Sequence, residues 1–300
     1  MKKQVILLAG GTGLLGNRMR QYFEAQEHEV RVLSRQASAP AKRRYHWDPV
    51  KREIDAQALT GVTILINLSG AGIADKRWTP ERKEELLKSR VVPNEFLAEL
   101  APKMPHLKQY LAASGINCYG YDRPKKIFVE TDDFGPDFLS QLVRQWEASA
   151  DLLSPFCKVT KIRISVVLTE EGGALETIAK PVRLGFGSPL GDGKQWMPWI
   201  HWLDLMRVFD FLIQHESGGV FNALGEVVDN TEFTQTLAKQ LGKKLWMPKV
   251  PAFALKLLLG EMSTVALEGV NASNAKLKRA GFQLQYPTLE KAMANLFPKG

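Results

Sequence analysis

The chain has 300 residues, of which 45% are hydrophobic and 24% charged. These are ordinary globular proportions, and they exclude a disordered, collagen-like or coiled-coil chain. The 40 Lys and Arg residues outnumber the 32 Asp and Glu residues, giving a formal net charge of +8, but they are scattered and form no basic arm. We therefore expect no nucleic-acid partner.

The two cysteines, Cys118 and Cys157, are too few for a disulfide framework and are typical of a reducing compartment. No apolar segment approaches the roughly 20 residues that span a bilayer. The sequence therefore predicts a cytoplasmic protein with no membrane partner. The apolar segment 251–260 is expected to be a buried helix, and the five histidines show no ligand spacing, so we expect no metal site.

The first 35 residues predict a strand–helix–strand unit. Residues 5–9 form a continuous apolar run, 17–26 are amphipathic, and 29–33 read as a second strand. Between the first strand and the helix lie Gly10, Gly13 and Gly16. Glycines at this spacing allow a tight turn, let a pyrophosphate approach the backbone and let the helix pack on the strand. In this context they predict a dinucleotide site that also includes Thr12, Leu14 and Leu15; the alternative is a purely structural turn.

The end of the second strand indicates which dinucleotide binds. An NAD site typically has an acid there for the ribose hydroxyls, whereas this strand ends in Ser34-Arg35 and the next acid is Asp48. An arginine can pair with the 2′-phosphate of NADP(H), and a serine can donate to it. We therefore predict NADP(H), with Arg35 as the main discriminator unless it is only a solvated loop residue.

Further strands and helices alternate through the first half of the chain. Strands are expected at 62–68, 107–113 and 159–168, and helices at 80–100, where Pro93 should kink or split the helix, and at 138–153. This alternation predicts an α/β fold of the Rossmann type, a doubly wound parallel sheet. The segment after the strand at 62–68 carries small residues that let a ligand lie close to the backbone. The cofactor candidates there are Leu68, Ser69, Gly70 and Ala71.

Glycine-rich turns and three tryptophans follow Leu168. We therefore place an NADP-binding Rossmann domain at 1–168 and a smaller substrate-binding domain at 169–300, with a helical region from about 246. This prediction leaves open that some later segments pack on the first domain. In doubly wound proteins the ligand lies at the carboxyl ends of the strands, so the cleft between the two domains is the expected site.

The chain resembles the extended short-chain dehydrogenase/reductase superfamily. Within it, the chain is similar to the atypical, NAD(P)-dependent epimerase-like family with a C-terminal DUF1731-like domain. The segments that carry the resemblance are 10–16, Ser34-Arg35, 66–70, 73–79, Ser89-Arg90, Trp146-Glu147, 163–168, 199–201 with Asp204, and Phe221-Asn222. The resemblance implies an NADP(H)-dependent reductase or nucleotide-sugar epimerase-like protein, with a small-molecule, nucleotide-linked substrate and a homodimer as one arrangement.

One departure from the superfamily concerns catalysis. Ser114 matches the catalytic serine, but the usual Tyr-x-x-x-Lys is absent from the next helix, where Phe138-Leu139 and, four residues on, Leu142-Val143 stand. A literal match at Tyr121 to Lys125 contains Pro124 and begins in an expected loop, so we interpret it as a decoy. Tyr119 is the alternative candidate for proton transfer, unless it packs under the loop.

The substrate candidates lie on both sides of the predicted cleft. The aromatic faces and the guanidinium suit a sugar or nucleotide ligand, and the histidine suits an anionic substrate or the role of a base. For each the alternative is core or interdomain packing. They are Arg77, Trp78, Trp196, Trp199 and His201. Because the usual dyad is missing, the sequence leaves two hypotheses open: an NADP(H)-dependent reductase or epimerase, and a non-catalytic NADP(H)-binding regulatory or interaction protein.

Overall fold

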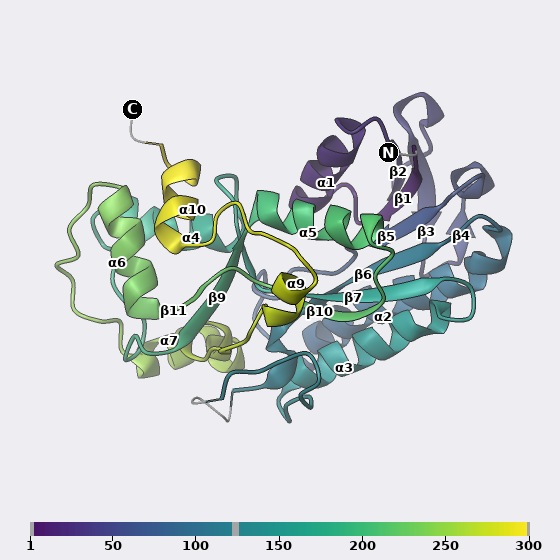
Figure 1. Ribbon diagram of the computed structural model, residues 1–300. Coiled ribbons are helices and arrows are strands. Elements are labelled where there is room, and N and C mark those ends of the chain that lie inside the picture. Colours follow the sequence, from purple (N-terminus) through teal and green to yellow (C-terminus); the bar gives the residue numbers. More distant parts are fainter. Residues whose placement is uncertain (1–2, 122–125, 299–300) are drawn as a thin grey trace.

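A central eight-stranded sheet organises the computed structural model, which describes residues 3–121 and 126–298. The strand order is β10-β7-β6-β5-β1-β2-β3-β4 (Figure 1). The strands are β1 (Val5–Ala9), β2 (Glu29–Ser34), β3 (Arg44–Asp48), β4 (Glu53–Ile54), β5 (Ile64–Asn67), β6 (Gln109–Gly115), β7 (Lys158–Ile164) and β10 (Gly219–Ala223). Neighbouring strands are parallel except for the β3–β4 pair. The Rossmann-type α/β fold predicted from the sequence is confirmed.

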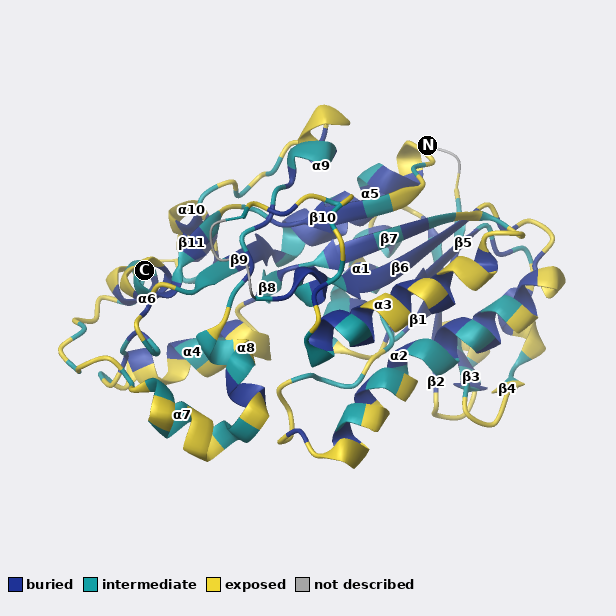
Figure 2. Cartoon of the chain, turned by 90° about the horizontal axis from the view of Figure 1, so that it is seen from below, coloured by how far each residue is buried: buried dark blue, intermediate teal, exposed yellow. Residues whose placement is uncertain are grey.

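Helices cover both faces of this sheet. Helices α1 (Leu14–Glu24) and α5 (Trp202–Gln214) lie on one face, and α2 (Pro80–Leu100) and α3 (Phe138–Ala150) on the other (Figure 1). Strand β1 shows why both faces are apolar: Ile6 and Leu8 join the core cluster on the α1 side, while Leu7 and Ala9 join the cluster on the α2 side. Figure 2 shows the strands as the most deeply buried layer.

A smaller sheet forms the second part of the molecule. It has the order β11-β9-β8, with β8 (Val166–Leu168) parallel to β9 (Trp196–His201) and β11 (Val227–Asp229) antiparallel to it. Its core is built around Trp199, Phe233 and Met293. The helices of this half are α4 (Gly173–Arg183), α6 (Asn230–Gln240), α7 (Ala252–Leu259), α8 (Thr264–Leu267), α9 (Ala275–Arg279) and α10 (Leu289–Leu296).

The two halves are interleaved along the chain. Strand β10 comes from the second half of the sequence but pairs with β7 as the outermost strand of the large sheet, and α5 packs on the same sheet. Segments after residue 168 thus complete the first sheet. The division of the chain into two domains at this residue remains a prediction.

Three local predictions are corrected by the structure. The run 159–168 is not one strand: β7 ends at Ile164, and β8 starts a different sheet two residues later. Between them Ser165 turns the chain, and its backbone N–H and hydroxyl both donate to the carbonyl of Ala223. Helix α2 is not split at Pro93 but continues through it to Leu100. The segment 251–260 does form a helix, α7, but none of the residues of this helix is buried.

Candidate functional site

The glycine loop after β1 is packed too tightly for larger residues. Gly10 has a φ of +77°, and a Cβ there would lie 2.7 Å from the carbonyl carbon of Leu68. A Cβ on Gly16 would collide with the carbonyl oxygen of Gly10. Gly13 is different: it is exposed, and a Cβ there would meet only an ordinary contact of 3.6 Å. The loop is thus packed against the segment after β5 at Gly10 and against its own backbone at Gly16, and it is exposed at Gly13.

Helix α1 presents its N-terminus at this open face. Gly13 is its N-cap residue, no side chain caps it, and its first turn carries no acid. The first backbone N–H groups of the helix therefore offer hydrogen bonds and a partial positive charge to an anion. This arrangement fits the pyrophosphate of a dinucleotide.

The carboxyl end of β2 lies beside the loop and carries the predicted Ser34 and Arg35. Ser34 is buried, and its Oγ accepts a hydrogen bond from the backbone of Gln36 at 3.2 Å. Arg35 is exposed, and among the described residues no ion pair engages it. Asp55 lies near this loop, but it accepts from the Ser38 hydroxyl at 2.6 Å and from the backbone of Gln57. In the part of the chain that the structure describes, the Arg35 guanidinium is thus exposed and has no acidic partner.

Side chains of helix α2 anchor the loop after β5. The Arg90 guanidinium donates to the carbonyl of Ala71 at 3.0 Å, and the Ser89 hydroxyl accepts from the Ala71 backbone at 3.0 Å. Arg82 donates to the carbonyl of Gly72. Arg90 is 6% exposed, and burial, with the nearby charge of Arg82, lowers its pKa to about 10. These anchors hold the predicted cofactor segment 68–71 in place. Sequence reasoning gave them no role, although Ser89-Arg90 stood within the resemblance.

A buried polar network lies at the carboxyl ends of β6, β7 and β10. Ser114 donates to Glu147 of α3 at 2.6 Å, and Arg163 of β7 pairs with both oxygens of Glu147 at 2.8 and 3.0 Å. Arg163 also donates to the Tyr119 hydroxyl at 2.9 Å, and that hydroxyl donates to Asn222 at 2.7 Å. Each of the five residues is at most 4% exposed.

This network limits what Ser114 and Tyr119 can do. A carboxylate only accepts hydrogen bonds, so the Ser114 proton is directed at Glu147 and away from a ligand. The Tyr119 hydroxyl accepts from Arg163 and donates to Asn222, and burial raises the pKa of this phenol. Ser114 retains lone pairs for a ligand hydroxyl, whereas Tyr119 has its proton engaged inside the protein.

Apolar side chains stand where the sequence leads us to expect the dyad. Leu139, Leu142 and Val143 belong to the core cluster beside the network, and Phe138 packs against it. A Cβ on Gly115 would lie 3.4 Å from Val143, so this residue faces the end of β6. In the literal Tyr121–Lys125 match, the Tyr121 hydroxyl accepts from Asn117 at 2.6 Å, while Pro124 and Lys125 lie outside the described residues.

The predicted substrate residues do not converge. Trp78 is 9% exposed; it donates to the carbonyl of Ile73 and packs edge-on against Phe138. Arg77 is exposed and lies against the backbone at Gly260, where a Cβ would be 3.0 Å from its Nε. Both residues therefore lie where the loop after β5 meets the C-terminal helices.

The remaining candidates lie within the second half. Trp199 is fully buried in its core, and Trp196 is half-buried and packs against Gly269. His201 is 1% exposed: its Nδ1 accepts from the Leu203 backbone at the start of α5, and its Nε2 lies 3.1 Å from Asn295. Burial lowers the pKa of His201 to about 4. Trp199 and His201 are thus packed in the protein interior, which is the alternative that the sequence left open for both.

Ion pairs join the two halves at both sides of the candidate site. Arg18 of α1 pairs with Glu170 at 2.8 Å, and Lys83 of α2 pairs with Glu261 at 2.6 Å. Next to Glu170, a Cβ on Gly172 would lie 3.8 Å from Leu14 in the first turn of α1. The loop between β8 and α4 therefore lies beside the N-terminus of α1.

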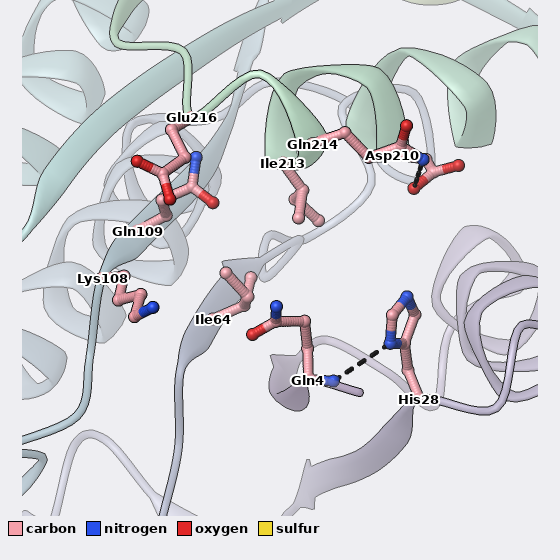
Figure 3. Close-up of a pocket in the computed structure, with 9 residues that line it drawn as sticks. All are labelled: Gln4, His28, Ile64, Lys108, Gln109, Asp210, Ile213, Gln214 and Glu216. Atoms are coloured by element: carbon pink, nitrogen blue, oxygen red, sulfur yellow. Dashed lines mark hydrogen bonds between the residues drawn. The ribbon is translucent and has the colours of Figure 1, made fainter. Parts of the chain in front are cut away.

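A cavity of about 340 Å³ lies at the opposite end of the strands, near their amino termini. Figure 3 shows its lining residues, which include Gln4, Ile64 and Gln109 at or just before the amino ends of β1, β5 and β6. His28 also lines it; its Nδ1 accepts from the backbone of Gln4 at 3.2 Å, and burial lowers its pKa. Because the cofactor loop is at the carboxyl ends of these strands, the cavity is not part of the candidate site.

Two kinds of feature are absent from the described part of the chain. No helix in residues 3–121 and 126–298 is long and apolar enough to cross a membrane. In the same part of the chain, no group of three or more His, Cys, Asp or Glu residues is arranged to hold a metal ion.

Family models match two separate parts of the chain. The NAD dependent epimerase/dehydratase family matches residues 6–139, and the domain of unknown function DUF1731 matches residues 250–296. Epimerase family protein SDR39U1 of Mus musculus is 31% identical over 97% of this chain and 99% of its own length. An epimerase family protein of Mycobacterium leprae is 32% identical over 98% of this chain and 95% of its own length.

Solved structures show the same relationship. Human epimerase family protein SDR39U1, crystallised with NADPH, superposes with a TM-score of 0.89 at 30% identity, covering 98% of this chain and 99% of that one. A nucleoside-diphosphate sugar epimerase from Corynebacterium glutamicum gives a TM-score of 0.81 at 28% identity, with 99% of this chain and 59% of that one covered. The chain therefore belongs to the NAD(P)-dependent epimerase-like family of atypical extended short-chain dehydrogenases/reductases that end in a DUF1731 domain.

Proposed function

We propose that this protein binds NADP(H) and uses it as an oxidoreductase or nucleotide-sugar epimerase-like protein. The observation that carries the proposal is the carboxyl end of β2, where Arg35 is exposed and unpaired among the described residues and no acid takes the place that NAD enzymes give to one. The human relative crystallised with NADPH supports the same cofactor. The bound nicotinamide would donate a hydride to the substrate as NADPH, or accept one from it as NADP+.

The proposed cofactor contacts are those of the glycine loop and two neighbouring strand ends. The backbone N–H groups at Gly13, Leu14 and Leu15 would bind the pyrophosphate, with Thr12 at the exposed tip of the loop. Ser34 and Arg35 would bind the 2′-phosphate, and the anchored segment 68–71 would line the opposite side. Gly10 and Gly16 would act by keeping the loop closed.

We propose a restricted role for the two catalytic candidates. Ser114 would accept a hydrogen bond from a substrate hydroxyl, because its own proton is held by Glu147. Tyr119 would position Arg163 and Asn222 rather than move a proton, because its hydroxyl proton is donated inside the network. The proton of the reaction would then come from solvent or the substrate, which favours a slow enzyme.

For the substrate, we propose a small, nucleotide-linked molecule bound in a site between the two halves of the chain. Arg77 and Trp78 would lie at the rim of this site and contact the substrate. Trp196, Trp199 and His201 would support the side of the site that the second half of the chain forms.

A non-catalytic role is the second candidate, and one observation favours it. The helix segment where the dyad is expected, residues 138–143, carries neither Tyr nor Lys, and its apolar side chains pack in the core. In this case the protein would keep NADP(H) as a structural or redox-sensing ligand and act through a partner.

The test is a fluorescence titration with NADPH and NADH on the wild type, on Arg35→Ala and on Arg279→Ala. Because a charged hydrogen bond is worth about 1.5–3 kcal/mol, Arg35→Ala should weaken NADPH binding about 10- to 100-fold and leave NADH binding unchanged. Arg279→Ala removes an exposed arginine on α9 and should have no effect. Equal binding of NADPH by all three proteins would contradict the proposal.

A second assay separates the two candidate functions. Protein loaded with NADPH is mixed with a panel of aldehydes and ketones, and nicotinamide absorbance is followed. Protein loaded with NADP+ is mixed with nucleotide sugars, and their epimers are separated by chromatography, because an epimerase returns the hydride and leaves no net change in absorbance. Turnover in either assay supports the enzyme; tight cofactor binding without turnover in both favours the regulatory role.

A further inference from the structure

The cavity at the amino ends of β1, β5 and β6 combines apolar and polar groups on a deeply buried wall. Its volume of about 340 Å³ is in the range of small-molecule sites. Two isoleucines of this wall, Ile64 and Ile213, are at most 7% exposed. Three polar side chains of the same wall, His28, Gln109 and Asp210, are at most 9% exposed. Apolar walls with a few polar groups set into them are typical of a ligand site.

The His28 ring has one nitrogen engaged by the protein and one that is not. Burial lowers its pKa, and Nδ1 accepts from the backbone N–H of Gln4 at 3.2 Å, so the proton of the neutral ring is on Nε2. Among the residues that the structure describes, none forms a hydrogen bond with Nε2. Figure 3 shows this nitrogen on the side of the ring that faces Asp210 and α5. The wall therefore offers one donor to a ligand.

Gln109 offers the opposite group. Its Nε2 donates to the carbonyl of Leu212 in α5 at 3.3 Å. The other end of this amide, Oε1, has no hydrogen-bond partner in residues 3–121 and 126–298. The wall therefore presents an acceptor for a donor on the ligand.

Asp210 brings a negative charge into this wall without a counter-charge. Its carboxylate accepts from the Tyr22 hydroxyl at 3.2 Å and from the Gln214 side chain at 2.8 Å. Both partners are neutral, because burial and the Asp210 charge raise the pKa of Tyr22 to about 12. Arg207, one turn earlier on α5, pairs with Asp204 instead, and no ion pair of the described chain includes Asp210. A buried carboxylate without a cation is costly, and its oxygens retain lone pairs for a ligand.

The C-terminal end of α5 adds to the negative potential. The helix ends at Gln214, and its last turn carries no basic residue, so nothing in that turn offsets the partial negative charge of the last carbonyl groups. Asp210 lies about one turn before this end, where a carboxylate is unfavourable for the same reason. Glu216, just beyond the helix, is an exposed residue of the cavity rim. This side of the cavity therefore favours a positively charged group.

We propose that this cavity binds a small α-amino acid with an aliphatic side chain, at a site separate from the cofactor loop. The ammonium group of the ligand donates to the Asp210 carboxylate and to Gln109 Oε1, and it supplies the counter-charge that Asp210 lacks. The side chain of the ligand packs against Ile64 and Ile213.

The carboxylate of the ligand has its own partners in the same cavity. Lys108 is exposed at the rim, and within the described ranges it takes part in no ion pair. His28 Nε2–H is the donor inside. An anion alone would meet Asp210 and Glu216, and a plain amine would leave Lys108 and His28 without an acceptor. A molecule that carries both charges satisfies both sets of groups.

The experiment is isothermal titration calorimetry of the full chain with L-leucine and L-valine. Two analogues test the two charges: isoamylamine lacks the carboxylate of leucine, and isocaproate lacks its ammonium group. We expect saturable binding of leucine or valine, and at least about tenfold weaker binding of each analogue, because each loses a charge-assisted contact.

Two variants assign the contacts. Asp210→Asn keeps an oxygen that can accept from Tyr22, and it should weaken amino-acid binding at least about tenfold. Lys108→Met changes an exposed side chain and should weaken leucine binding about fivefold or more while leaving isoamylamine binding unchanged. Both should bind NADPH as the wild type does, because the cofactor loop lies at the other end of the strands; the two titrations therefore succeed or fail independently.

Matched controls remove exposed residues of the same kinds outside the cavity. Asp133→Asn removes an acid and Lys103→Met a lysine, and both variants should bind leucine as the wild type does. Thermal unfolding of every variant shows that it is folded.

Three outcomes overturn the proposal. The first is no saturable binding of leucine or valine up to about 10 mM. The second is a folded Asp210→Asn variant that binds them as the wild type does. The third is isocaproate binding as tightly as leucine, which would mean that the cavity does not recognise an ammonium group.

Discussion

Glu147 and Arg163 form a two-pronged ion pair in which both side chains are at most 5% exposed. The pair joins α3 to β7 and holds Ser114 on one side and Tyr119 on the other. The pair thus places its two charges in the protein interior.

Breaking this pair should strongly destabilise the fold. Glu147→Gln leaves Arg163 buried without its counter-charge, so we expect a loss of about 3–5 kcal/mol in the free energy of unfolding by denaturant titration. The control is Asp151→Asn, which breaks the more exposed pair with Lys161 at 2.8 Å and should cost at most about 1 kcal/mol. Similar losses for both variants would show that the buried pair has no special weight.

Two alanine substitutions in the glycine loop should separate folding from ligand binding. Gly13→Ala fits the protein but places a methyl group on the open face, so we expect an unchanged unfolding midpoint and NADPH binding weakened at least about tenfold. Gly16→Ala places a methyl group against the Gly10 carbonyl, so it should lower the unfolding midpoint and weaken NADPH binding. Both are measured by thermal unfolding and fluorescence titration; wild-type binding by Gly13→Ala would place the pyrophosphate elsewhere.

Arg90 should control the order of the loop after β5. Arg90→Met removes its hydrogen bonds to the carbonyls of Leu86 and Ala71, so amide hydrogen exchange in the segment 69–73 should accelerate and NADPH binding should weaken about fivefold or more. Lys88→Met on the exposed side of the same helix is the control. Unchanged exchange in Arg90→Met would mean that Arg82 and Ser89 hold the loop without it.

His201 should make stability fall in mild acid. Its pKa is lowered to about 4 in the fold, below its ordinary value of about 6.5. Between these values the unfolded chain binds more protons, so the free energy of unfolding should decrease as pH falls from about 6.5 towards 4, by up to about 3 kcal/mol. His201→Asn keeps an N-cap acceptor for α5 and should flatten this slope.

The matched control for this titration is His106→Asn, which replaces an exposed histidine. Its stability profile should follow the wild type. If His201→Asn retained the full slope, the titration would belong to other groups, of which His28, also with a lowered pKa, is the first to examine.

Local patterns predicted the framework of this molecule. The apolar run 5–9 and the glycine spacing gave β1 and the loop because both depend on neighbours in sequence. Strand β3 was missed although it carried a signal, since buried Tyr45 and Trp47 alternate with less buried residues. The break at Ser165 was invisible, because a backbone partner 58 residues away turns the chain there.

The site was less predictable than the fold for the same physical reason. Glycines and the end of β2 mark the cofactor loop in sequence, but the network that engages Ser114 joins residues up to 103 positions apart. Periodicity explains why Trp146 is buried in α3, yet it does not reveal that its neighbour Glu147 meets Arg163. Exposed α7 was also mispredicted, because an apolar segment of that length does not show by itself whether anything covers it.

The late arrival of β10 has a consequence for synthesis on the ribosome. The nucleotide-binding sheet begins at Val5 but gains its outermost strand only when Gly219–Ala223 has emerged. Until then β7 is an open edge, with its backbone available to other chains, and Tyr119 lacks its acceptor on Asn222. The nascent chain must therefore protect this edge for about fifty residues after β7 is made, and a fragment ending at Leu168 would keep it permanently unpaired.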